Sequence, residues 1–185
     1  FALYVLIASI FSFGQISYMF FVMDAQATLQ TRNPILSSML LYVLFNIFYT
    51  IAAIPVGALS DKIGRWNMLI AGYILFTLTL VNFIAAASLG AFVSCFIMYG
   101  ISLALIKVLH KACTADLAPA HLKATALGTF ESITGLCTFG ASIIAGSLWQ
   151  WGTHHHVFLA AAVISGLGAI LLLATKHTLT HHRLI

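Results

Sequence analysis

The sequence predicts an all-α membrane protein with six transmembrane helices. Apolar residues make up 62% of its 185 residues, whereas Asp, Glu, Lys and Arg together make up 6%. About a quarter of the residues of a soluble domain are charged, so this chain could not cover a water-facing surface. Its apolar runs last about 20 residues, which is the length of a helix that crosses the hydrocarbon core, and they lack the alternation of barrel strands.

The first three spans are predicted at about 1–23, 36–59 and 67–88. The second follows Asn33 and Pro34, which suit the cap and the first turn of a helix. Pro55 lies inside the same run and should bend its last turns, because proline cannot donate the helical hydrogen bond. A short charged hinge separates this run from the third.

The last three spans are predicted at about 90–110, 124–149 and 154–175, before a basic tail at 176–185. A tight turn at Leu89 and Gly90 should connect the third run to the fourth. Trp149 closes the fifth run, as expected where aromatic residues gather at the membrane surface. The chain begins with Phe1 rather than Met, so we expect it to be part of a longer protein.

The basic residues predict how the chain crosses the membrane. In a six-helix weave, seven of the eight fall on one side, and Arg32 alone falls on the other: Lys62, Arg65, Lys107, Lys111, Lys123, Lys176 and Arg183. Loops that face the cytoplasm carry an excess of Lys and Arg. We therefore expect both ends of this segment to be cytoplasmic, in a bacterial cytoplasmic (inner) membrane.

The charged hinge reads Gly57-Ala58-Leu59-Ser60-Asp61-Lys62-Ile63-Gly64-Arg65. It resembles the loop pattern G-x-L-[SA]-D-[KR]-x-G-R of the major facilitator superfamily, which joins the second and third helices of each six-helix half. Trp66 and Asn67 stand where further basic residues are usual. The segment from Ala115 to Gly128 is similar to the loop before the fifth helix of the C-terminal half in that family.

The resemblance implies a fold and a function. The chain would be the C-terminal half of a twelve-helix transporter, built as two inverted three-helix repeats, with an N-terminal six-helix half completing it. Its function would be secondary active transport of a small solute by alternating access, with proton coupling as one form. Gly57, Asp61, Lys62, Gly64 and Arg65 would form a gating motif, or a simple topological anchor, at the lipid surface. A receptor or assembly subunit that kept the fold without transporting is the alternative.

Polar residues inside the spans are candidates for function, because burying them in a membrane is costly. Glu131 shares a helix face with Gly128, Gly135, Thr138 and Ser142. Such a small, polar face packs closely or lines a cavity. Glu131 should therefore point inward, either as a carboxylate that binds a proton or substrate or as one paired with a base. Lys107 could be that base, although it could also extend to the membrane surface.

Gln15 and Asn46 are the amides expected near the middle of the first and second spans. Amides at this depth either bind a substrate or join helices by hydrogen bonds. His110, next to the predicted end of the fourth span, is expected at the membrane surface.

Several other classes of function lack support in the sequence. It contains no P-loop for nucleotide phosphates and no H-E-x-x-H motif or paired aspartates of a membrane enzyme. The histidine run 154–156 has no acidic or cysteine ligand beside it, so we expect no metal site there. We predict no enzyme, no cofactor and no nucleic-acid partner, since the position of the basic residues already explains the positive charge.

Overall fold

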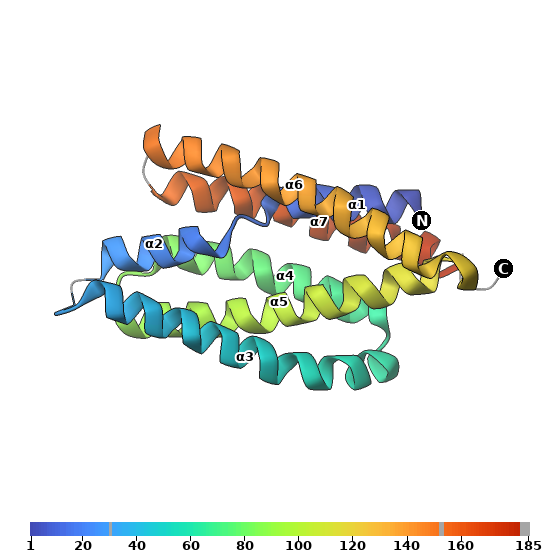
Figure 1. Ribbon diagram of the computed structural model, residues 1–185, viewed down its shortest axis with the longest axis horizontal. Coiled ribbons are helices and arrows are strands. Elements are labelled where there is room, and N and C mark those ends of the chain that lie inside the picture. Colours follow the sequence, from blue (N-terminus) through green and yellow to red (C-terminus); the bar gives the residue numbers. More distant parts are fainter. Residues whose placement is uncertain (30, 152–153, 182–185) are drawn as a thin grey trace.

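The computed structural model describes residues 1–29, 31–151 and 154–181, and every regular element in these ranges is helical. The helices are α1 (Ala2–Gly14), α2 (Tyr18–Thr28), α3 (Pro34–Ile63), α4 (Arg65–Ala85), α5 (Leu89–Leu117), the short 3₁₀ helix η1 (Ala120–Leu122), α6 (Lys123–Trp151) and α7 (His154–His181). Figure 1 shows the long helices lying side by side in one elongated bundle.

Six segments of the described chain are long and apolar enough to cross a membrane, with α1 and α2 together forming the first. The predicted all-α fold with six transmembrane helices is therefore confirmed, and the chain is an integral membrane protein. The most exposed segments are α3 and α6–η1, in which 17% of the apolar window is buried. Their exposed sides carry large apolar residues such as Ile54 and Leu136.

The packing of the helices follows the two predicted repeats. The first repeat consists of α1–α2, α3 and α4, and the second consists of α5, α6 and α7. Each contact made by a helix of one repeat has an equivalent in the other: α3 packs on α5 as α6 packs on α1, and α4 packs on α5 as α7 packs on α1, while α4 and α7 pack on each other. Because each repeat contains three spans, an odd number, the second repeat runs in the opposite direction through the bundle.

Small residues allow the closest helix contacts. A Cβ atom at Gly14 would lie 2.6 Å from the backbone nitrogen of Ser165 in α7, and one at Gly168 would lie 2.8 Å from the Cβ of Phe11 in α1. A Cβ at Gly100 would lie 2.7 Å from the carbonyl oxygen of Phe45. These glycines place the backbones of α1 and α7, and of α3 and α5, in direct contact.

The first span differs from the continuous run predicted at 1–23. Helix α1 ends at Gly14 and α2 begins at Tyr18, so Gln15, Ile16 and Ser17 are not helical. The N–H of Gln15 donates to Ser12 O and that of Ile16 donates to Gly14 O, both at 3.1 Å, in place of helical bonds. The span contains no proline here, and the end of α1 is instead held against α7.

Three predicted boundaries also differ. Helix α3 continues through Pro55 to Ile63, so most of the predicted hinge is helical. The turn between α4 and α5 lies before Leu89, because the hydroxyl oxygen of Ser88 accepts the N–H of Ala91 at 3.3 Å and caps α5. Helix α7 runs to His181, which makes the first part of the predicted tail helical; the tail residues 182–185, with Arg183, lie outside the described residues.

The start of α3 is capped differently from the prediction. Pro34 is the first helical residue, as expected, but the side chain of Asn33 makes no capping hydrogen bond. The carbonyl oxygen of Asn33 instead accepts bonds from the N–H and the hydroxyl of Ser37.

The start of α1 and the end of α7 lie at the same end of the bundle in Figure 1, together with the turns between α3 and α4 and between α5 and α6. These turns carry the predicted cluster of basic residues, including Lys62 and Lys123. The α2–α3 connection, which contains Arg32, lies at the opposite end. The distribution of charge along the bundle therefore follows the predicted weave.

Candidate functional site

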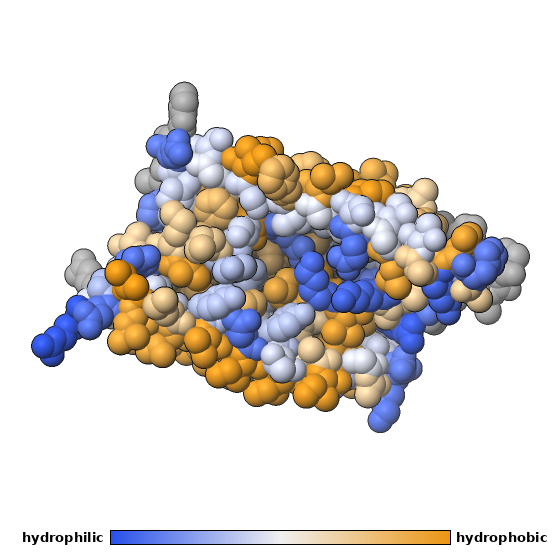
Figure 2. Space-filling model, in the orientation of Figure 1, coloured by the Kyte–Doolittle hydropathy of each residue, from blue (hydrophilic) through white to orange (hydrophobic). Residues whose placement is uncertain are grey.

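The main candidate site is an open cavity of about 420 Å³ bordered by α1, α2, α4, α5 and α6. Its polar lining residues are Ser12, Gln15, Ser17, Lys107, His110, Glu131, Thr134, Thr138 and Ser142. Its aromatic lining residues are Tyr18, Phe76, Tyr99, Phe130 and Phe139. Figure 2 shows hydrophilic residues gathered in a hollow at the centre of this face, with hydrophobic residues along its edges.

Three of the four predicted candidates meet in this cavity: Gln15, Lys107 and Glu131. Asn46 does not. It lies on α3, lines a separate shallow groove with Tyr42 and Thr50, and donates its amide to the carbonyl oxygen of Tyr42 at 2.8 Å. Tyr42, which shares this face of α3, stacks on the cavity residue Tyr18 with ring centroids 5.1 Å apart, so Asn46 lies beside the cavity without lining it.

Glu131 is brought to the cavity by the predicted polar face of α6. Gly135, Thr138 and Ser142 from that face also line the cavity. The hydroxyl of Thr138 donates to Thr134 O and that of Ser142 to Thr138 O, each at 2.9 Å, so each hydroxyl oxygen keeps its capacity to accept a hydrogen bond. Among the described residues, Glu131 forms no ion pair.

Lys107 faces the cavity from α5, and its side chain is exposed. It forms no ion pair with any described carboxylate. The Lys107–Glu131 ion pair considered above is therefore not formed in this structure, although both residues line the same cavity.

His110 is a cavity residue that sequence reasoning missed. It is 4% exposed rather than at the membrane surface, and its Nε2 lies 2.8 Å from the hydroxyl of Tyr73 on α4. The prediction was wrong because α5 extends to Leu117, about two turns beyond its expected end. Spacing offered a signal, since His110 follows Lys107 by three residues and shares its face.

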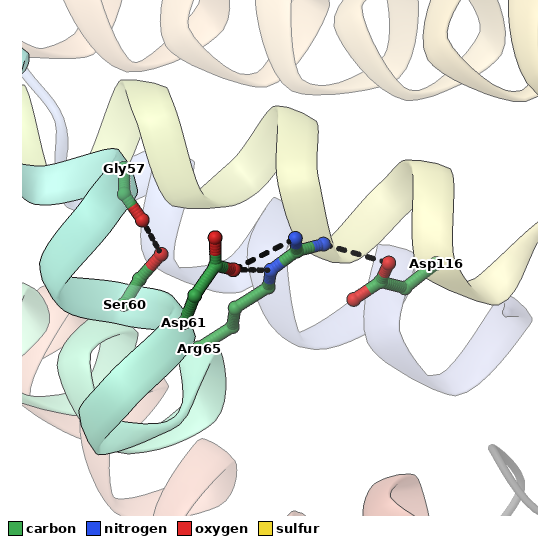
Figure 3. A network of polar contacts seen from close by, with 5 residues as sticks. All are labelled: Gly57, Ser60, Asp61, Arg65 and Asp116. Carbon is green, nitrogen blue, oxygen red and sulfur yellow. Dashed lines mark hydrogen bonds and ion pairs between the residues drawn. The ribbon is translucent and has the colours of Figure 1, made fainter.

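The second candidate site is the charged turn between α3 and α4. The Arg65 guanidinium donates to Asp61 at 3.0 and 3.2 Å and to Asp116, near the end of α5, at 2.7 Å. Figure 3 shows Arg65 between the two carboxylates. Asp61 pairs with Arg65 across the turn, and Asp116 connects this turn to the other repeat.

Gly64 forms the turn itself. Its φ of +99° and ψ of +128° make it the single residue with positive φ among those described. A side chain rarely tolerates this conformation, which explains why glycine separates α3 from α4. The hydroxyl of Ser60 donates to the carbonyl oxygen of Gly57 at 2.7 Å, so this hydrogen bond lies within α3.

Two further residues of the motif, Gly57 and Lys62, lie on the outside of α3. A Cβ atom at Gly57 would meet no atom within 4 Å, so Gly57 does not serve a close helix contact within the described chain. Lys62 is exposed and forms no ion pair with the described residues. Helical continuation of α3 places both residues on its outer surface.

The opposite end of the bundle holds a smaller polar contact. His154 Nδ1 lies 3.2 Å from the Asp24 carboxylate, and the ring of His154 stacks on Trp149 at 4.1 Å. His155 lies near the same carboxylate. No group of three His, Cys, Asp or Glu side chains within the described ranges is arranged to hold a metal ion.

Comparison with known proteins places these features in context. The family model of the Major Facilitator Superfamily matches residues 5–183. A curated relative from Methanocaldococcus jannaschii, described as an uncharacterized MFS-type transporter, is 38% identical over 174 residues. The aligned region covers 92% of this chain and 44% of the relative, so the chain spans less than half the length of the relative it matches.

Proposed function

The chain belongs to the major facilitator superfamily, and we propose that it is the C-terminal half of a secondary transporter that moves a small solute across a membrane by alternating access. The observation that carries this proposal is the cavity, which is open on one side of this six-helix unit and has an intramembrane carboxylate in its wall. An N-terminal six-helix half would complete the cavity. Membrane lipids would cover the remaining apolar surface.

Glu131 is the proposed proton-coupling group. It lies eight residues, or about 12 Å, from the start of α6, and ionisable residues are rarely placed at such depth without function. Lys107 and His110 from α5 and Ser12 from α1 line the same cavity. A proton on Glu131 would change the charge of a site that α1, α5 and α6 share.

The charged turn is the proposed cytoplasmic gating motif. Arg65 joins α4 to Asp61 of α3 and to Asp116 of α5, so this contact couples both repeats at one surface. Lys62, exposed on the same turn, suits contact with anionic lipid head groups. The proposal includes a cytoplasmic location of this turn and of both ends of the segment, in the inner membrane of a bacterium.

The experiment uses the full-length protein in proteoliposomes that contain a trapped pH-sensitive dye. Addition of a panel of small solutes should produce a solute-dependent change of internal pH with at least one member. Glu131→Gln should abolish the pH change, because glutamine does not bind a proton in this range. Asp24→Asn, a carboxylate substitution outside the cavity, is the matched control and should retain it.

Two results would contradict this proposal. If Glu131→Gln moves protons as the wild type does, Glu131 is not the coupling group. If the panel moves neither protons nor labelled solute, the non-transporting receptor or assembly subunit becomes the better description of the protein.

A further inference from the structure

We propose that the interruption between α1 and α2 is a carboxylate-binding subsite, and that the transported solute is a small organic monocarboxylate. This inference rests on the proposed transport function and adds the chemical class of its substrate. Residues that line the cavity here carry three kinds of hydrogen-bond or charge donor: the first amides of α2, the side chain of Gln15, and Lys107.

The backbone supplies the first donors. The N–H of Met19 donates to the hydroxyl of Ser17 at 3.4 Å, and that of Phe20 to the carbonyl of Ser17 at 3.1 Å. For the N–H groups of Ser17 and Tyr18, the described residues offer no acceptor. Both residues line the cavity, and the N-terminus of a helix carries partial positive charge that favours an anion.

Gln15 supplies an independent indication of a ligand. It is 7% exposed and lines the cavity, and its Nε2 has no hydrogen-bond partner among the described residues. A buried amide left unpaired costs about 1–3 kcal/mol. A ligand oxygen bound at the interruption would remove this cost, and a carboxylate offers two acceptor oxygens with no donor of its own.

Lys107 supplies the charge. It is the one Lys or Arg residue, and Glu131 is the one Asp or Glu residue, that lines the cavity in the described chain. When Glu131 carries the proposed coupling proton, Lys107 leaves the wall with one positive charge. A monocarboxylate matches that charge, whereas a phosphate dianion would keep an uncompensated negative charge away from water, at high cost. Among oxyanions, the lining of this half therefore favours the carboxylate.

The remaining wall describes the body of the ligand. The rings of Phe76, Tyr99 and Phe130 border the same space, together with Leu103. Apolar surface of this kind binds an aromatic or aliphatic group by removing it from water. The ligand is thus a carboxylate with an apolar body, rather than a sugar or another polyhydroxylated solute.

The test measures binding to the full-length protein in lipid nanodiscs by calorimetry. The probes are benzoate and hexanoate, their neutral counterparts benzamide and hexanamide, and inorganic phosphate. At least one carboxylate should bind at least tenfold more tightly than its amide and than phosphate. Gln15→Leu and Lys107→Gln should each weaken its binding at least tenfold.

Matched controls separate these effects from general damage. Asn82→Leu removes an exposed amide of α4 that is not among the lining residues of this cavity. Lys111→Gln, one turn further along α5, is the control for Lys107→Gln. Both controls should bind the carboxylate as the wild type does. Equal binding of acid and amide, tighter binding of phosphate, or equal loss in variants and controls would each overturn the proposal.

Failure of this proposal can be distinguished from failure of the proposed transport. Proton movement driven by another solute, without carboxylate binding, would refute only the substrate class. Carboxylate binding without any solute movement would refute transport and retain the subsite.

Discussion

Arg65 bridges two carboxylates whose surroundings differ. The Asp116 side chain is 24% exposed, whereas that of Asp61 is 63% exposed. Water and ions screen an exposed pair more strongly, and ion pairs four residues apart usually contribute about 0.3–0.5 kcal/mol. The contact between repeats should therefore be worth more than the contact within the turn.

A double-mutant cycle can compare the two contacts. With Arg65→Ala and Asp116→Ala, we expect a coupling energy of about 1 kcal/mol, because the charge-assisted bond is short and partly shielded. With Arg65→Ala and Asp61→Ala, we expect about 0.5 kcal/mol or less. The measurement is thermal unfolding of the full-length protein in detergent. An Asp61 coupling equal to or above that of Asp116 would contradict the assignment of Asp116 as the principal partner.

Some residue contacts were accessible from the sequence and others were not. The hinge motif located Asp61 and Arg65, because its charges stand out in an apolar chain. Asp116 lies 51 residues from Arg65, and pairing them requires knowing that the end of α5 lies beside the start of α4. His110 was missed for a related reason. The fourth span was predicted to end at residue 110, whereas α5 continues to Leu117.

Among the elements, the first span depends on its contact with α7. Gly14 ends α1 with its Cα against the backbone of Ser165 and Ala161. A continuous helix was predicted here because apolar residues continue on both sides of the interruption and no proline marks it. The length of an apolar run is enough to predict that a helix forms. The interruption depends on a contact with α7, which the spacing of apolar residues does not reveal.

Gly14→Ala should destabilise the protein by about 1–3 kcal/mol, because the new methyl group would overlap the α7 backbone. Gly166→Ala is the matched control on α7. Its Cβ would lie 3.5 Å from the nearest atom, a methyl group of Thr77, and alanine favours a helix over glycine. Thermal unfolding in detergent should show a lower midpoint for Gly14→Ala and an unchanged or higher one for Gly166→Ala. Equal midpoints would show that the α1–α7 contact can relax.

For the whole molecule, the charge distribution defines a polarity. Hydropathy alone predicted the number of spans. Because successive connections lie on opposite sides of the membrane, the positions of the basic residues in the sequence then predicted that most of them share one end of the bundle. The packing symmetry of the repeats could not be inferred from hydropathy, because it depends on which helix faces meet.

Cysteine labelling can test this polarity. Lys62→Cys and Lys176→Cys should react with an impermeant maleimide from the same side of the membrane, and Arg32→Cys from the other side. Cys95 and Cys113 are buried, and Cys137, which is partly exposed, is first replaced by alanine. Reaction of the Lys62→Cys and Lys176→Cys proteins from opposite sides would refute the six-span weave.

The two repeats are unequal in one respect. The first helix of one repeat is divided into α1 and α2, while its counterpart α5 is a continuous helix of 29 residues. A divided rod can bend where a continuous one resists, and here α1 is held by α7 while α2 packs on α3. In the proposed transport cycle, opening at the α2 end would use local bending beside the cavity, whereas opening at the other end would require whole helices to tilt. The cavity would then open toward the two faces of the membrane by two different kinds of helix movement.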